Sequence, residues 1–116
     1  MTARKDPITI VVTNDGMGNA DRALAHKLMQ TYLNLLDLED RLPATICFYA
    51  DGAKLVVDGS PVLEELESLA EKGVDLIACG TCLNFFDLAN QVKVGRVGSM
   101  KDIIAAQWGA EKVITL

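Results

Sequence analysis

Strand-like and helix-like segments alternate along the whole 116-residue chain, and this alternation constrains its fold more than any other feature. Runs rich in aliphatic and β-branched residues predict strands over 8–13, 44–49, 74–79 and 112–116. Residues 92–97 fit either a short strand or an extended loop. Because alternating strands and helices build parallel sheets, we expect an α/β fold, a three-layer α/β/α sandwich around a mostly parallel sheet of about five strands.

The segments between the strands have helical periodicity and capping residues. Ser60 is expected to cap one helix, and Ser99 another, with Asp102 completing a capping box and both Ile103 and Ile104 facing inward. The first helix should bury a stripe of large side chains at three- and four-residue spacing. This stripe comprises Leu24, Leu28, Tyr32, Leu35 and Leu36.

Composition and charge narrow the class of protein. Half of the residues are apolar, which suits one compact domain over 1–116, with residues 1–7 as a flexible or extended start. A formal charge of -5 disfavours partnership with nucleic acid or with an anionic membrane. The basic start is followed by an apolar run too short for a secretory signal or a membrane span, so a cytoplasmic location is expected.

The two cysteines of Cys79-Gly80-Thr81-Cys82 stand where a predicted strand ends and a helix begins. Unpaired backbone N–H groups and the helix dipole at such a turn favour a thiolate, the nucleophile of sulfur chemistry. The N–H groups of Gly80 and Thr81 would stabilise a developing sulfur anion. The alternative is that the cysteines are small apolar fillers, a common role for a free cysteine.

An odd number of cysteines does not suit an extracellular disulfide framework, so redox, sulfur-carrying or metal chemistry is left. A structural zinc site takes four ligands, and the available cysteines and histidine are spread over separate segments. They are Cys47, Cys79, Cys82 and His26. We therefore expect neither a metal nor another cofactor.

Ligands of open α/β sheets bind beyond the carboxyl ends of the strands, where four glycine-containing loops are expected to meet. Asp15, Gly16, Gly18 and Asp51 are the candidate ligand-binding residues of these loops. Asp-Gly pairs are also common in tight turns, so both readings stay open. The loop at 16–19 lacks the glycine pattern of a dinucleotide fingerprint and the lysine of a phosphate-binding loop.

The strings at 73–83 and 94–100 resemble the DsrE/DsrF-like family, and more closely the carboxy-terminal domain of YedF-type, selenium-metabolism sulfurtransferase-like proteins. The similarity extends to 16–18, 51–55 and 112–114 and so covers nearly the whole chain. The resemblance implies a DsrE-like fold, assembly into trimers or hexamers, and the handling of sulfane sulfur or selenium as a persulfide-type adduct. YedF-type proteins usually carry a TusA-like domain that this sequence lacks, so a separate TusA-like donor or acceptor protein is expected.

In this family the sulfur-bearing cysteine ends the strand that corresponds to 74–79, which is Cys79 here. The leading hypothesis is a sulfur carrier or sulfurtransferase-like protein that holds a persulfide on Cys79, with Cys82 resolving or protecting that adduct. Two alternatives stay open. One is a non-enzymatic oligomeric module that binds a small ligand or a partner, and the other is a thiol-disulfide oxidoreductase that uses both cysteines.

Overall fold

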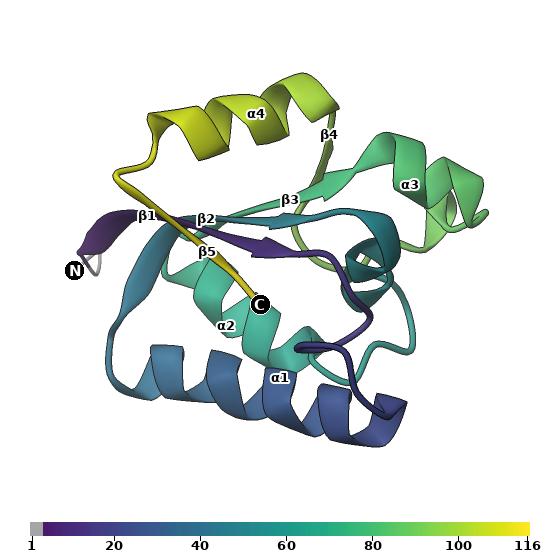
Figure 1. Ribbon diagram of the computed structural model, residues 1–116, viewed down its shortest axis with the longest axis horizontal. Coiled ribbons are helices and arrows are strands. Elements are labelled where there is room, and N and C mark those ends of the chain that lie inside the picture. Colours follow the sequence, from purple (N-terminus) through teal and green to yellow (C-terminus); the bar gives the residue numbers. More distant parts are fainter. Residues whose placement is uncertain (1–3) are drawn as a thin grey trace.

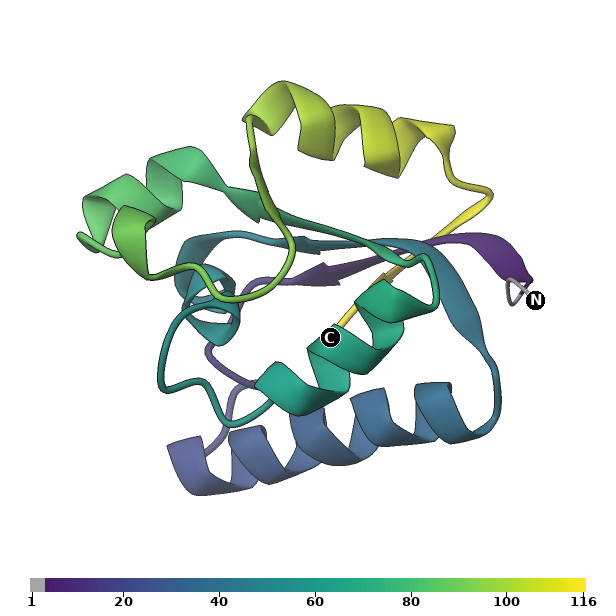
Figure 2. The same ribbon diagram turned by 180° about the vertical axis from the view of Figure 1, so that it is seen from behind.

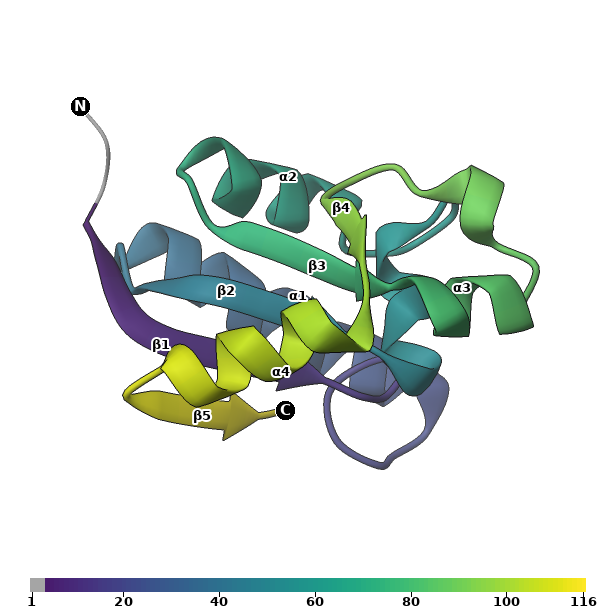
Figure 3. The same ribbon diagram turned by 90° about the horizontal axis from the view of Figure 1, so that it is seen from above.

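A five-stranded parallel sheet forms the centre of the computed structural model, which describes residues 4–116. Its strand order is β4-β3-β2-β1-β5, as Figure 3 shows from above. The elements in chain order are β1 (Lys5–Val12), α1 (Arg22–Leu38), β2 (Leu42–Phe48), the 3-10 helix η1 (Ala50–Val56), α2 (Leu63–Glu71), β3 (Asp75–Cys79), α3 (Gly80–Phe85), the 3-10 helix η2 (Ala89–Gln91), β4 (Arg96–Gly98), α4 (Met100–Gly109) and β5 (Lys112–Thr115).

Helices cover both faces of the sheet, which confirms the predicted α/β class. Helices α1 and α2 lie on one face, and α4 crosses the other (Figures 1 and 2). Helix α3 continues β3 beyond the carboxyl edge of the sheet. The open question about 92–97 is resolved by β4, which begins at Arg96 and pairs in parallel with β3. Among residues 4–116, no helix has the length and apolar character needed to cross a membrane.

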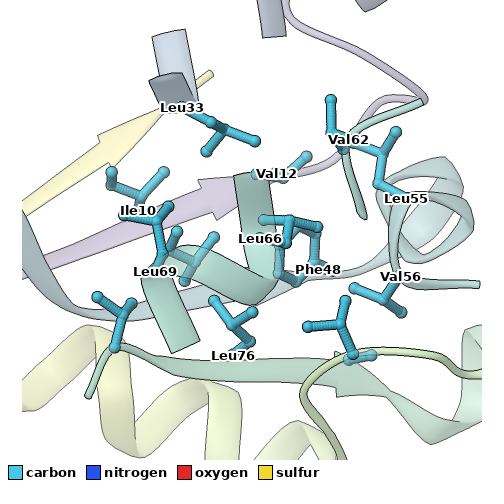
Figure 4. Close-up of a cluster of buried hydrophobic side chains, with 14 of the residues drawn as sticks. Ile10, Val12, Leu33, Phe48, Leu55, Val56, Val62, Leu66, Leu69 and Leu76 are labelled. Atoms are coloured by element: carbon cyan, nitrogen blue, oxygen red, sulfur yellow. The ribbon is translucent and has the colours of Figure 1, made fainter. Parts of the chain in front are cut away.

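The main core lies between the sheet and the pair α1 and α2. In Figure 4, Phe48 of β2 lies beside Leu66 of α2, and Ile10 of β1 lies beside Leu69 of the same helix, all in one buried cluster. These side chains are almost fully buried. A smaller cluster under α4 consists of Cys47, Ile77, Cys79 and Ile103. Two of the three cysteines are therefore part of the packing between the sheet and α4.

The stripe predicted for the first helix was wrong in its phase. Ala25, Met29 and Leu33 are the buried residues of α1, whereas Leu24, Leu28 and Leu35 are between 42% and 49% exposed. Tyr32 and Leu36 are partly buried against the core. Helix α1 carries apolar residues on two faces. The loop before the helix approaches it so closely at Ala25 that only a small side chain fits at that position. A Cβ on Gly16 would lie 2.6 Å from the Cβ of Ala25.

The two serine caps had different outcomes. Helix α2 begins at Leu63, and the Ser60 Oγ accepts the Val62 N–H at 3.3 Å in the turn before it, so Ser60 does not cap the helix as predicted. Ser99 does cap α4, and its N–H donates to the Asp102 carboxylate at 2.8 Å. Ile103 is buried as expected, but Ile104 is 48% exposed because α4 presents only one narrow face to the sheet.

Candidate functional site

Cys79 is the last residue of β3 and the residue that precedes the first turn of α3. Its side chain is 1% exposed and packs with Cys47, Ile77 and Ile103 beneath α4. Within the described part of the chain, the Cys79 side chain accepts no capping hydrogen bond from α3. Direct contact between this thiol and a bulky reactant is therefore blocked by the packing around it.

The glycine of the motif stands where a side chain would crowd its neighbour. Helix α3 begins at Gly80 with no intervening loop, and a Cβ there would lie 3.2 Å from Val97 Cγ1. That separation is tighter than ordinary van der Waals contact, so β4 presses directly on the start of α3. Gly80 and Thr81 form the first turn of this helix, at the position where sequence reasoning expected anion-stabilising N–H groups.

Cys82 lies one helical turn further on and differs from Cys79 in its surroundings. It is partly exposed, and its Sγ accepts the backbone N–H of Ala50 at 3.1 Å. Ala50 has a φ of 54°, a left-handed conformation that is uncommon for a residue other than glycine. Such strained residues are maintained only where the surrounding structure holds them, and they cluster at functional sites.

Ionisation of the thiols follows from these environments. Burial raises the pKa of Cys82 above its ordinary value, the Ala50 N–H lowers it, and the neighbouring Cys79 raises it through a hydrogen bond and its charge. Burial also raises the pKa of Cys47 to about 11, with a smaller contribution from the Asp75 carboxylate. Cys47 therefore remains a thiol at neutral pH, as suits a residue in the interior of β2.

A shallow apolar hollow opens beside Cys82. It has a volume of about 260 Å³ and is lined by Ala50, Thr81, Cys82, Phe85 and Phe86. The two phenylalanine rings pack edge to face with centroids 5.5 Å apart, and Phe85 is 84% exposed. The Nζ of Lys54 lies 4.4 Å from the Phe86 ring centroid, a cation–π contact at the rim.

The predicted edge loops form a second, polar cavity of about 240 Å³. Asp15, Gly18 and Asp51 line it, but Gly16 is buried against α1 and does not. The other lining residues are Asn14, Asn19, Ala20, Arg22, Ala25 and Lys54. The structure therefore brings together three of the four loop residues expected from the sequence.

The charges of this polar cavity are largely paired. Asp15 contacts Arg22 at 3.3 Å and the ring of His26 at 3.1 Å, and Asp51 contacts Lys54 at 2.9 Å. Lys54 also lies over Phe86, so it links this cavity to the hollow beside Cys82.

Sequence reasoning missed Ala50, Lys54 and Arg22. The order Asp51-Gly52-Ala53-Lys54 contains a signal for one of them, because side chains three apart on a helical turn can form an ion pair. The Ala50 contact has no such signal, since it joins positions 32 residues apart.

The donor set gives no support for a metal. In the part of the chain that the structure describes, no three or more His, Cys, Asp or Glu side chains are grouped as metal ligands would be.

The DsrE/DsrF-like family model matches residues 6–116, and the chain belongs to this family. The family is associated in general with sulfur relay. None of the curated proteins matches the sequence.

Three solved structures share the fold. The ychN protein from E. coli superposes with a TM-score of 0.70 at 17% identity, over 97% of this chain and 100% of that one. MTH1491 from Methanobacterium thermoautotrophicum, a protein of unknown function, has a TM-score of 0.66 at 18% identity, over 94% and 97%. BT1422 from Bacteroides thetaiotaomicron, also of unknown function, has a TM-score of 0.65 at 16% identity, over 95% of each.

Proposed function

We propose that this protein is a sulfur carrier or sulfurtransferase-like protein that holds sulfane sulfur as a persulfide on Cys79, with Cys82 resolving or protecting the adduct. The observation that carries the proposal is the packing of Cys82 against the buried cluster that contains Cys79, at the carboxyl edge of the sheet, in a member of a family associated with sulfur relay. A thiolate that attacks the outer sulfur of a persulfide R–S–SH gains that sulfur and releases the thiol R–SH. No oxidant is consumed in this exchange.

The adduct can leave the pair in two ways. A thiol of an acceptor takes the outer sulfur and regenerates Cys79. Alternatively, Cys82 attacks the inner sulfur, so that hydrogen sulfide is released and a Cys79–Cys82 disulfide forms. The second route converts both thiols into a disulfide. This also protects Cys79 from overoxidation, because a disulfide can be reduced, whereas sulfinic and sulfonic acids of cysteine are in general irreversible.

The proposal also includes the subfamily to which this protein belongs and its partners. We propose a YedF-type relationship, with selenium as an alternative cargo, a TusA-like donor or acceptor, and action in the cytoplasm. The Cys-Gly-Thr-Cys-Leu string at 79–83 supports the relationship. A homo-oligomer, a trimer or hexamer, is part of the same proposal and is supported by the exposed Trp108.

Intact-protein mass spectrometry after incubation with glutathione persulfide tests the carrier role. We expect wild-type protein to gain about 32 Da per bound sulfur atom and the double variant Cys79→Ser/Cys82→Ser to gain none. Cys47→Ala is the matched control, because it removes a buried thiol outside the motif and should load as wild type does. If wild-type protein gains no sulfur, or the double variant gains it equally, the carrier role is lost.

A non-enzymatic binding module is the second candidate, and the burial of Cys79 favours it. In that case the hollow and the polar cavity would hold a ligand or partner, and the thiols would be packing residues. A thiol-disulfide oxidoreductase is the third, favoured by the packing of Cys82 against the cluster that contains Cys79. Redox titration followed by alkylation tests it, because an oxidoreductase requires a reversible Cys79–Cys82 disulfide and the absence of this disulfide would exclude the third candidate.

A further inference from the structure

The two thiols of the motif differ in how a donor can reach them. Cys79 is 1% exposed under α4, whereas Cys82 is partly exposed and lines the apolar hollow. Sulfur exchange requires the attacking and attacked atoms to approach within roughly 3–3.5 Å in an aligned geometry. A donor sulfur can take that position at Cys82 from the hollow, but at Cys79 it would have to displace packed side chains such as Ile103.

The Ala50 N–H gives Cys82 a backbone donor suited to a sulfur anion. It lies 3.1 Å from the Cys82 Sγ, and its direction is fixed by neighbouring hydrogen bonds. The Tyr49 N–H donates to the Val12 carbonyl at 3.1 Å, and the Gly52 N–H donates to the Tyr49 carbonyl at 3.0 Å. These bonds on both sides hold Ala50 in its left-handed conformation. The strain at Ala50 is thus associated with an amide that points at the sulfur.

Transfer between the two thiols needs no movement across the molecule. Cys82 also packs against the buried cluster that contains Cys79, so it contacts both the hollow and the interior. The region around Cys79 excludes solvent. Sulfur held there is sheltered from competing thiols and oxidants, whereas sulfur held on Cys82 faces the hollow.

We propose that Cys82 is the first acceptor of sulfur from the donor and that it passes this sulfur inward to Cys79. This inference rests on the proposed function and adds an order of events to it. In the first step Cys82–SH and R–S–SH give Cys82–S–SH and R–SH. In the second step Cys79 attacks the outer sulfur, so that Cys79–S–SH forms, and the Cys79 proton ends on the departing Cys82 sulfur. The Ala50 N–H stabilises the Cys82 anion both as nucleophile and as leaving group.

The hollow indicates the class of donor. Its walls are two phenylalanine rings and the small side chains of Ala50, Thr81 and Cys82. Such a surface suits a persulfide sulfur presented on an apolar patch. A protein-borne and a small-molecule persulfide share this chemistry, so one of each serves as probe: glutathione persulfide and a TusA-like protein loaded with sulfur on its cysteine.

Rapid quenching followed by peptide mass spectrometry tests the order with each probe. We expect wild-type protein to show persulfide on Cys82 before Cys79. Cys79→Ser should accumulate sulfur on Cys82 at the wild-type initial rate, and Cys82→Ser should load Cys79 at least about ten-fold more slowly. Cys47→Ala is the control and should load as wild type does. A difference in loading rate between the two probes identifies the source that the hollow prefers and leaves the order unaffected.

Three outcomes would overturn the order. They are loading of Cys79 in Cys82→Ser at the wild-type rate, failure of Cys79→Ser to load Cys82, and persulfide on Cys79 before Cys82 in wild type. Absence of sulfur from every form would instead refute the carrier function itself. Alkylation of native wild-type protein with iodoacetamide gives a reading independent of any variant: Cys82 should be modified before Cys79, and equal rates would contradict the inference.

Discussion

At the scale of single residues, three cysteines of identical chemistry occupy three different environments. Cys47 lies within the sheet and is fully buried, Cys79 ends a strand beneath α4, and Cys82 borders the hollow. Only Cys82 has a backbone N–H directed at its sulfur, among the thiols in the described residues. The position of each thiol in the fold, rather than its spacing in the motif alone, therefore determines which reactants it can meet.

The burial of Cys47 predicts a loss of stability at alkaline pH. Its pKa is about 11 in the folded protein against 9.0 for a free thiol, so the unfolded chain releases this proton first as pH rises. The free energy of unfolding should fall by about 2–3 kcal/mol through this group between those two pH values. The stability is fully present below the lower pH and is lost as the pH approaches the higher one.

Urea unfolding of wild type and Cys47→Ala at about pH 8 and about pH 11 measures this contribution. The alanine variant lacks the ionisable group, so the difference between the two proteins isolates it from the titration of lysines and tyrosines. The stability advantage of wild type should shrink or reverse at the higher pH. A pH-independent difference would mean that Cys47 ionises as easily in the folded protein as in the unfolded chain.

At the scale of elements, η1 is positioned by contact with the end of β1. A Cβ on Gly52 would lie 2.1 Å from the Val12 carbonyl oxygen, a distance that no side chain can tolerate. The same 3-10 helix begins at Ala50, the donor to Cys82. Gly52 therefore allows the backbones of η1 and β1 to lie close together. This contact holds the Ala50 amide, the donor to Cys82, in place.

Gly52→Ala is expected to destabilise the protein by about 3 kcal/mol, because β1 and η1 must separate to admit the methyl group. Gly109→Ala is the matched control, since a Cβ there meets nothing within 4 Å. That change should be neutral or stabilise α4 by about 0.5 kcal/mol. Chemical denaturation of both variants checks the contrast, and equal effects at the two positions would contradict the role given to Gly52.

At the scale of the whole molecule, exposed apolar side chains gather along the outer face of α4. Met100 and Ile104 are 47% and 48% exposed, and Trp108 is 87% exposed. The four-residue spacing places them on one face of the helix. Large exposed apolar groups in a row are typical of surfaces that pack against another protein. This face supports the proposed assembly into trimers or hexamers.

Trp108→Glu is expected to weaken that assembly, because a carboxylate would be buried without a partner in an apolar interface. Light scattering coupled to size-exclusion chromatography should show an oligomer for wild type and a smaller species for the variant. Lys101→Glu introduces the same charge on α4 outside the apolar row and should leave the oligomer intact. A wild-type protein that is monomeric at tens of micromolar would refute the proposed assembly.

Much of the fold follows from local pattern. The alternation of aliphatic runs with helical periods predicted the α/β class, and the Ser99 capping box was correct because a cap depends on residues adjacent in the chain. The buried stripe of α1 was not predictable in the same way. Leucines outnumber the small residues there, but the sheet and the loop at Gly16 select the face that carries Ala25. Hydrophobicity alone does not specify which face of the helix fits against the closely packed sheet and loop.

For the candidate site, the sequence by itself determined that two thiols stand at the end of a strand, three residues apart, with a glycine between them. Only the tertiary structure decided that Cys79 is enclosed by α4, that Cys82 faces a hollow, and that Ala50 donates to it. The physical reason is range: strand and helix propensities act over a few residues, whereas burial and this hydrogen bond join segments that are distant in the chain. Accessibility, which governs the order of reaction proposed for the two thiols, is a property of the packed molecule.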